Sequence, residues 1–163
     1  MKKIGIDIHG VLDANPKHFV EIAERTLSDG GEVHIMTGIE WSEEVKEELM
    51  SYGNGEPYWT HFMSIITYLR SKGEPGYYDE RGRYWFYNDD AWDKVKGIYC
   101  EENNIAEIYD DTRQYRKHMP SFTNFFLYSH DPVKHEMKLR NPHLFPKPQP
   151  ADHQMQEIFE ENK

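Results

Sequence analysis

Short apolar runs alternate along the chain with segments in which hydrophobic residues recur at helical spacing. The apolar runs that have the length of a buried strand cover residues 3–8, 33–36, 105–109 and 124–128. The segments that predict amphipathic helices cover residues 16–28, 42–52, 59–69 and 90–102. Strands that alternate with helices imply right-handed crossovers and a parallel sheet, so we expect an α/β fold with a three-layer, Rossmann-like arrangement.

An aromatic segment interrupts this alternation. Aromatic residues at both ends of residues 77–87 flank a polar turn with Gly82, which predicts either a hairpin or a strand with an extended lead-in, within a small insertion at about residues 54–90. The helix that follows is expected to begin at the capping residue Asp90 and to run to about Glu102, with Asn103-Asn104 as its exit, because asparagine adopts the left-handed conformation readily.

The length of the chain limits the number of domains. With 163 residues it is long enough to bury one core, so we expect one main domain over residues 1–130. Residues 131–163 form a proline-rich extension, in which regular structure is broken and only residues 155–159 offer a short helix.

Composition and charge exclude several classes of protein. The chain is 37% hydrophobic and 14% aromatic, which argues against disorder, and its net charge of −10 disfavours binding along DNA or RNA. Cys100 is the one cysteine, so a disulfide within the chain and a two-thiol redox or zinc site are excluded. We find no apolar stretch long enough to span a membrane, and the first apolar run is broken by Asp7 too early for a signal peptide, so we expect a cytoplasmic protein.

Polar residues follow the predicted strands in an order that suggests phosphoryl transfer. Asp7 ends the first run, Thr37 follows the second, and Asp110 with Asp111 follows the third, while Lys96 lies in the helix before it. Each is ordinary by itself, since Thr37 could lie in a simple turn and the acidic pair could cap a helix. Together they would meet at the carboxyl ends of parallel strands, where α/β proteins bind ligands.

These residues resemble the motifs of the haloacid dehalogenase-like (HAD-like) superfamily. The positions that match are Asp7, Gly10 and Val11 for the first motif, Thr37 for the second, Lys96 for the third, and Asp110 with Asp111 for the fourth. The resemblance extends over about residues 3–128 and implies a HAD-like fold. Lys94 is an alternative to Lys96, which fits the usual spacing to the acidic pair better.

The resemblance implies a magnesium-dependent phosphatase that acts through an aspartyl-phosphate. Asp7 would be the nucleophile. The metal ligands would be Asp7, the backbone carbonyl of His9, Asp110 and Asp111. The substrate phosphate would be held by Thr37, Gly38, Lys96 and Arg113.

His9 departs from the family pattern. Phosphatases of the superfamily carry a second aspartate at this position, which protonates the leaving group and then activates water. Imidazole titrates near neutral pH, so His9 can perform the same task. The alternative is a catalytically impaired HAD-like domain that binds a phosphorylated ligand or a protein partner. A receiver domain has similar residues but places its acidic pair after the first strand and its lysine last, the reverse of the order here.

The predicted insertion is the candidate for substrate selection. Its possible contacts are Trp59, Tyr77, Tyr78, Arg83, Tyr84 and Trp85. Aromatic side chains can stack on a base and arginine can pair with a phosphate. The run from Asp110 to Arg113 also resembles nucleotidases and polynucleotide end phosphatases of the superfamily. Because the chain is acidic, we expect a small phosphomonoester, with a mononucleotide as one candidate, rather than a long nucleic acid.

Overall fold

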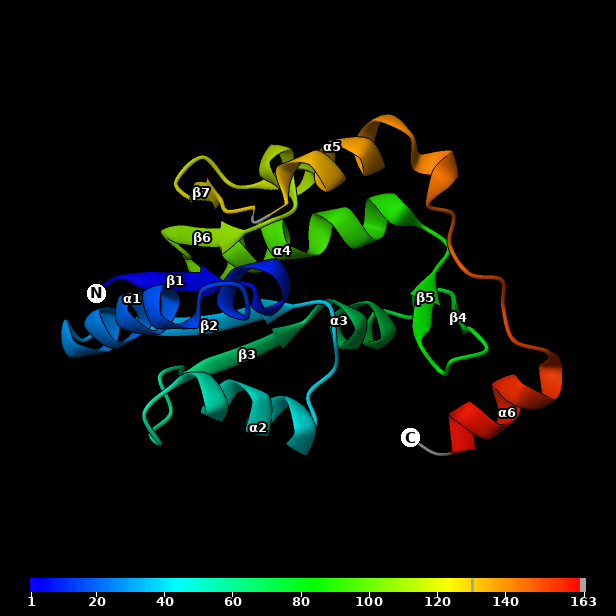
Figure 1. The fold of residues 1–163 in the computed structure, drawn as a ribbon, viewed down its shortest axis with the longest axis horizontal. Helices are drawn as coiled ribbons and strands as arrows, with labels where there is room; N and C mark the ends of the chain where they lie inside the picture. Colours follow the sequence, from blue (N-terminus) through cyan, green and yellow to red (C-terminus); the bar gives the residue numbers. More distant parts are fainter. Residues whose placement is uncertain (130, 162–163) are drawn as a thin grey trace.

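The computed structural model, which describes residues 1–129 and 131–161, contains a five-stranded parallel sheet (Figure 1). Its strands, in the order β3-β2-β1-β6-β7, are β3 His61–Ser64, β2 Glu32–Thr37, β1 Lys3–Ile6, β6 Glu107–Asp110 and β7 Asn124–Leu127. Each neighbouring pair is parallel. The expected α/β class and parallel sheet are therefore confirmed.

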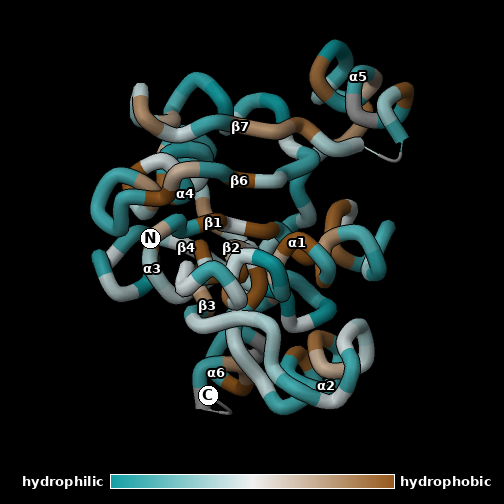
Figure 2. The backbone as a smooth tube through the Cα atoms, turned by 90° about the vertical axis from the view of Figure 1, so that its left-hand side faces the viewer, coloured by the Kyte–Doolittle hydropathy of each residue, from teal (hydrophilic) through white to brown (hydrophobic). Residues whose placement is uncertain are grey.

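Helices lie on both faces of this sheet. Figure 2 views the strands end-on, with α1 (Pro16–Ser28) and α2 (Glu43–Tyr52) on one side and α3 (Ile65–Ser71) and α4 (Asp89–Asn103) on the other. Because side chains alternate along a strand, Ile4 and Ile6 pack in the core beneath α1 and α2, whereas Met36 belongs to the core beneath α3 and α4. The arrangement is compatible with a three-layer Rossmann-like fold.

The direction in which successive strands are added across the sheet reverses at β1. The strands β1, β2 and β3 follow one another towards one edge, and the chain then returns so that β6 pairs with the other side of β1. The carboxyl ends of β1 and β6 therefore form the topological switch point, where open α/β sheets usually bind their ligands.

The helix expected over residues 59–69 is wrong in its first half. His61–Ser64 forms β3, which pairs with β2 in the register His34–His61 to Thr37–Ser64, and α3 starts only at Ile65. Short apolar runs fit either a strand or a helix, and here pairing with β2 decides in favour of the strand. The Ser64 side chain then caps α3 by accepting a hydrogen bond of 3.1 Å from Thr67 N. The first part of the segment expected as an insertion is thus an edge of the main sheet.

The expected hairpin is present as a separate two-stranded antiparallel sheet. Its strands are β4 (Gly76–Tyr78) and β5 (Tyr84–Phe86), and it lies beyond the carboxyl ends of the main strands (Figure 1). The buried Asp79 carboxylate accepts hydrogen bonds of 2.9 Å each from Arg81 N, Arg83 N and Trp85 Nε1. Burial acts to raise the pKa of Asp79, but these hydrogen bonds outweigh it and hold the pKa below its ordinary value.

The boundaries of α4 differ slightly from expectation. Asn88 rather than Asp90 is the capping residue, and its side chain accepts a hydrogen bond of 3.0 Å from Ala91 N. The exit at Asn104 is confirmed, since this residue has a φ of 55° in the left-handed region.

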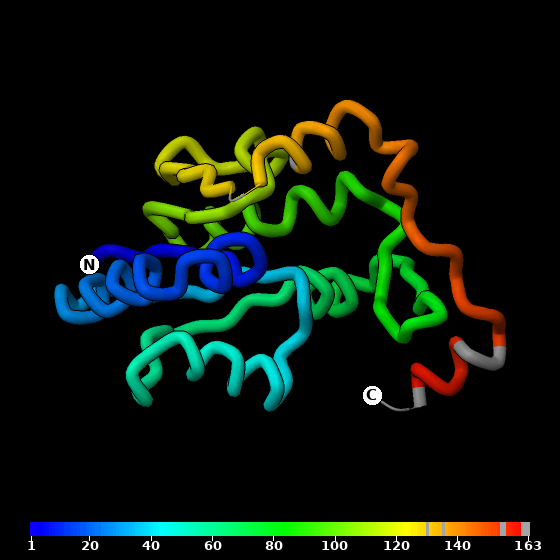
Figure 3. The backbone as a smooth tube through the Cα atoms, in the orientation of Figure 1, coloured from blue at the N-terminus to red at the C-terminus, as the bar shows by residue number. Residues whose placement is uncertain are grey.

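The C-terminal extension is more regular than the proline pattern predicts. It contains α5 (Pro132–Arg140), a 3-10 turn (Pro142–Leu144) and α6 (His153–Glu161). Pro132 is tolerated in the first turn of α5, where its missing N–H would have no helical partner. The extension, orange to red in Figure 3, then runs alongside the hairpin. No described helix is both long enough and apolar enough to cross a membrane.

Candidate active site

The turn after β1 brings two loops into close contact. Asp7 directly follows β1, and its N–H donates a hydrogen bond of 3.0 Å to Tyr109 O, which extends the pairing of β1 with β6. Gly10, in the turn, has a φ of +86° and lies so close to Asp111 that a Cβ atom here would clash with its Oδ2. Glycine is therefore required at position 10 both by conformation and by space.

Carboxylates from β1 and β6 converge beyond this edge of the sheet. Asp7, Asp110 and Asp111 each offer an oxygen, and these oxygens lie within 4.8 Å of one another. Asp7 and Asp110 are buried, while Asp111 is partly exposed. Thr112 N donates a hydrogen bond of 2.9 Å to Asp110 Oδ1, which holds this carboxylate in place at the end of β6.

A buried lysine from α4 is the counter-ion of this cluster. Lys96 Nζ lies 2.5 Å from Asp110 Oδ2 and 3.2 Å from Asp7 Oδ1, and the residue is only 2% exposed. Lys94 instead forms an exposed ion pair of 2.6 Å with Asp90. Of the two lysines considered for the third motif, the one beside the carboxylates is Lys96.

The electrostatics of the cluster show an excess of negative charge. Burial, followed by the charges of Asp110 and Asp111, raises the pKa of Asp7 well above its ordinary range, although Lys96 acts in the opposite direction. Burial likewise raises the pKa of Asp110. Burial acts to lower the pKa of Lys96, but Asp110 and Asp7 outweigh it and raise that pKa. One ammonium group thus stabilises three adjacent carboxylates only in part, and a further cation would favour their ionised forms.

The loop after β2 forms the opposite wall. Thr37 is 1% exposed at the end of β2 and lines the same cavity as Asp7 and Lys96. The carbonyl of Gly38 accepts hydrogen bonds of 3.2 Å from Ser64 Oγ and from Ile66 N. Strand β3, which the sequence analysis did not predict, and helix α3 therefore hold the loop that carries Thr37 and Gly38.

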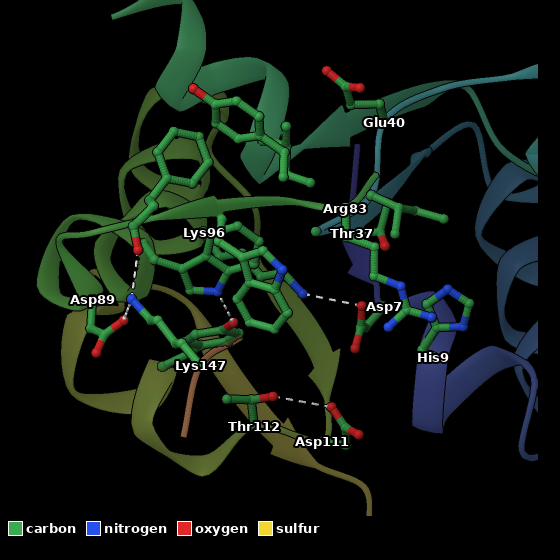
Figure 4. Close-up of a pocket in the computed structure, with 18 of the residues that line it drawn as sticks. Asp7, His9, Thr37, Glu40, Arg83, Asp89, Lys96, Asp111, Thr112 and Lys147 are labelled. Carbon is green, nitrogen blue, oxygen red and sulfur yellow. Dashed lines mark hydrogen bonds and ion pairs between the residues drawn. The ribbon is translucent and has the colours of Figure 1, made fainter. Parts of the chain in front are cut away.

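These residues share one cavity of about 800 Å³ (Figure 4). The predicted site residues that line it are Asp7, His9, Thr37, Gly38, Lys96 and Asp111. The hairpin contributes Tyr78, Arg83, Tyr84 and Trp85. Of the other aromatic residues suggested as contacts, Trp59 packs against Tyr58 instead, and Tyr77 donates a hydrogen bond of 2.9 Å to Pro148 O.

His9 lies at the mouth of the cavity. Its side chain is 54% exposed, and Nδ1 lies 3.3 Å from Asp13 Oδ2. In Figure 4 the side chain of Arg83 extends from the hairpin towards His9 and Asp7. His9 thus lines the same cavity as Asp7, and its imidazole is open to solvent.

Arg113 does not join this group. It lines a neighbouring cavity of about 560 Å³ and forms an ion pair of 3.1 Å with Glu136 on α5. The two cavities share Trp85, Trp92, Asp111, Thr112 and Tyr115. Arg113 could therefore contact only a part of a ligand that extends away from Asp7.

The cavity residues that the sequence interpretation missed include Trp92, Tyr115 and Lys147. Trp92 Nε1 donates a hydrogen bond of 2.8 Å to Tyr115 Oη, and Lys96 Nζ lies 5.3 Å from the centroid of the Tyr115 ring. Trp92 precedes Lys96 by one helical turn, so both side chains lie on one face of the helix. This spacing could have identified Trp92 as a cavity residue from the sequence. Lys147, which donates a hydrogen bond of 2.5 Å to Phe86 O and pairs with Asp89, comes from the extension and has no sequence signal.

Comparison with known proteins identified no relative of this chain. No family model matches the chain, and searches of curated proteins and of solved structures also gave no match. The arguments about this site therefore rest on its own geometry and chemistry.

Proposed function

We propose that this protein is a magnesium-dependent phosphohydrolase of the HAD-like kind, which cleaves a small phosphomonoester through an aspartyl-phosphate on Asp7. The observation that carries the proposal is the convergence of Asp7, Asp110, Asp111 and Lys96 at the switch point of the sheet. A carboxylate nucleophile beside a lysine and two further acidic residues suits a reaction whose transition state carries its charge on phosphoryl oxygens.

The donor set fits a magnesium ion. Asp7, Asp110, Asp111 and the backbone carbonyl of His9 would hold it, and all of these are oxygen donors of the type that Mg²⁺ prefers. Burial and then the charges of Asp110 and Asp111 raise the pKa of Asp7, so a bound cation would favour its ionised form. When bound, the ion would neutralise the carboxylates and polarise an oxygen of the phosphoryl group.

The chain's own residues can perform both displacements. In the first, an Asp7 oxygen attacks phosphorus, the bond to the leaving oxygen breaks, and protonated His9 gives its proton to that oxygen. Lys96, the Thr37 hydroxyl and the Gly38 N–H hold the phosphoryl oxygens. In the second, neutral His9 takes a proton from water, the water oxygen attacks phosphorus, and the bond to Asp7 breaks to release inorganic phosphate.

The cavity beyond the reacting group favours a substrate with an aromatic part. Tyr78, Tyr84, Trp85 and Trp92 line it together with the cations Arg83 and Lys147. Such a wall can stack on a base, and the cations can pair with a second anionic group. A mononucleotide satisfies both features, while the net charge of −10 opposes a long nucleic acid.

One observation favours a second candidate function. The aspartate expected as the proton donor is replaced by His9, whose imidazole contacts Asp13. If this contact keeps His9 from the leaving group, the domain binds a phosphorylated ligand or protein partner without turnover.

A panel of phosphomonoesters, assayed with and without magnesium, tests the proposal. We expect magnesium-dependent release of phosphate from at least one nucleotide, and no release by an Asp7→Asn variant. Absence of turnover on the whole panel, with retained phosphate binding, would favour the ligand-binding domain. Equal turnover by the parent and by Asp7→Asn would refute the covalent mechanism.

A further inference from the structure

A second group of possible metal ligands lies at the amino ends of β2 and β3, the opposite end of the sheet from the Asp7 cavity (Figure 1). Glu32 and His34 are two residues apart on β2 and therefore lie on the same face. His61 is the first residue of β3 and is paired with His34 in the strand register. One donor atom from each of the three residues lies within 4.8 Å of the others.

His34 is buried with one ring nitrogen unsatisfied. The residue is 1% exposed, and its Nδ1 lies 2.6 Å from the Tyr99 hydroxyl on α4. Among the described residues, Nε2 has no hydrogen-bond partner, although Glu32 Oε1 lies 3.4 Å away. If Nδ1–H donates to Tyr99, the lone pair of Nε2 faces a carboxylate oxygen. In this tautomer a buried Nε2 and a partly exposed Oε1 face each other as two acceptors, and either a proton or a metal ion between them would stabilise the pair.

We propose that Glu32, His34 and His61 bind a divalent transition-metal ion of the zinc class. Ligands bound at about 2.0–2.1 Å to a tetrahedral ion are about 3.3 Å apart. The observed separations are 3.4 Å from Glu32 Oε1 to His34 Nε2 and 3.8 Å from Glu32 Oε1 to His61 Nδ1. The two separations from Glu32 Oε1 are therefore close to those of ligands on one ion, although the His61 ring has to change its orientation.

His61 is the ligand that has to move. Its ring is stacked on that of His34, with centroids 4.2 Å apart and an interplanar angle of 5°, whereas a shared ion must lie in the plane of each ring. The His61 side chain is 48% exposed, so it can rotate out of the stack with little loss of packing. In doing so it gives up its contact of 2.8 Å with Thr60 Oγ1.

The surroundings prepare Glu32 and His34 for a metal ion. Lys3 Nζ lies 3.4 Å from Glu32 Oε2, which leaves Oε1 to face the two histidines. Tyr99, beside Nδ1 of His34, is the kind of partner that orients metal-bound histidines.

The donor set selects the class of ion. Two imidazoles and one carboxylate favour Zn²⁺ and its neighbours over Mg²⁺ and Ca²⁺, which prefer oxygen donors. The site would join β2 to β3, a strand at the edge of the described sheet. Since an ion that binds only the folded state stabilises it, the expected role is to hold this edge in place.

Titration of the chelator-treated, full-length chain with Zn²⁺ in excess Mg²⁺ tests the proposal, because Mg²⁺ occupies oxygen sites without competing for histidines. Calorimetry should show one Zn²⁺ per chain, and Zn²⁺ should raise the Tm. His61→Ala is the deciding variant, since His34 is buried and its replacement could unfold the protein. We expect His61→Ala to bind Zn²⁺ at least about tenfold more weakly and to lose the Tm shift.

The matched control is His153→Ala, which removes a histidine whose side chain is 90% exposed on α6. This variant should bind Zn²⁺ as the parent does. Circular dichroism of His61→Ala should match the parent, so that weak binding is not a result of unfolding. The proposal is wrong if the parent binds no Zn²⁺ in excess Mg²⁺, or if His61→Ala binds it as tightly as the parent.

Discussion

The two ends of the parallel sheet carry clusters of opposite character. At the carboxyl ends, Asp7, Asp110 and Asp111 offer only oxygen atoms and share the buried cation Lys96. At the amino ends, the buried His34 lies beside the exposed His61 and the partly exposed Glu32, and Lys3 Nζ lies 3.4 Å from Glu32 Oε2. The first arrangement suits a hard ion and a phosphate, and the second suits an ion that prefers nitrogen.

The two ends also differ in what covers them. The hairpin β4–β5 lies over the carboxyl ends, and the extension packs against it through Ala151 N, which donates a hydrogen bond of 2.8 Å to Tyr78 O. His61 at the amino ends remains exposed. A covered cavity can exclude water and select a substrate, whereas an open site can bind an ion but offers little selection. This difference agrees with the two proposals, catalysis at the carboxyl ends and stabilisation by a metal ion at the amino ends.

The largest expected effect is the loss of turnover in Asp7→Asn, which tests the chemistry of the carboxyl-end cluster. Burial and the neighbouring carboxylates raise the folded-state pKa of Asp7, so the ionised group opposes folding once the pH exceeds its unfolded pKa. Asparagine removes that cost, and the Tm at pH 7 should be unchanged or higher while phosphate release disappears. Calorimetry and a phosphate assay measure the two quantities, and loss of both activity and fold would contradict this interpretation.

Removal of metal ions distinguishes the proposed roles of the two clusters. Treatment with a chelator should abolish turnover, and Mg²⁺ alone should restore it, because the carboxyl-end donors are all oxygen atoms. His61→Ala should keep this response, since His61 is at the other end of the sheet. Undiminished turnover after exhaustive chelation would show that the acidic cluster works without an ion.

The acidic site was predictable because its signals are local. Asp7 directly follows β1, Asp110 is the last residue of β6, and Gly10 marks the turn after Asp7. The HAD-like assignment itself stays a prediction. The amino-end cluster was not found, because His34 meets His61 only through β3, and the pattern of that segment fits a helix as well as a strand.

The extension shows a different limit of sequence patterns. No described side chain of α5 is buried, so this helix lacks the hydrophobic periodicity by which helices are recognised. Local capping forms it instead, since Asp131 accepts a hydrogen bond of 3.0 Å from Lys134 N. Lys147 reaches the cavity by a long-range contact with Asp89, which no local pattern records.

His9→Ala is expected to have the next largest effect. If His9 transfers protons, this variant should turn over about 10²- to 10⁴-fold more slowly, with the smaller loss for substrates that have good leaving groups. His9→Asp restores the residue usual in the resembling family and should retain activity with a shifted acidic limb of the pH profile. An unchanged rate of His9→Ala on a poor leaving group would exclude proton transfer by His9. A parent inactive on all substrates, with activity in His9→Asp, would support the ligand-binding domain.

Asp79→Ala tests whether the covered end depends on the hairpin turn. The variant removes three hydrogen bonds to a buried carboxylate, so we expect a loss of about 2–3 kcal/mol in the free energy of unfolding if the hairpin unfolds with the core. Arg83 and Trp85 would lose their positions in the cavity, so KM should rise more than kcat falls. Glu80→Ala, a change at the exposed neighbour in the same turn, is the matched control and should leave both quantities unchanged.

The pH dependence of the stabilisation by Asp79 provides a further test, with the smallest expected effect. Its folded-state pKa lies below the ordinary value of 3.8, so its contribution to stability is fully present above the unfolded pKa and is lost as the pH falls through the folded pKa. The difference in unfolding free energy between the parent and Asp79→Ala should therefore be constant near neutral pH and shrink only in acid, below about pH 4. Urea titrations at pH 7, 5 and 3 measure it. A difference that shrinks already between pH 7 and 5 would mean that the ionised Asp79 does not hold the hairpin, and that the cover of the carboxyl-end cavity depends on the extension instead.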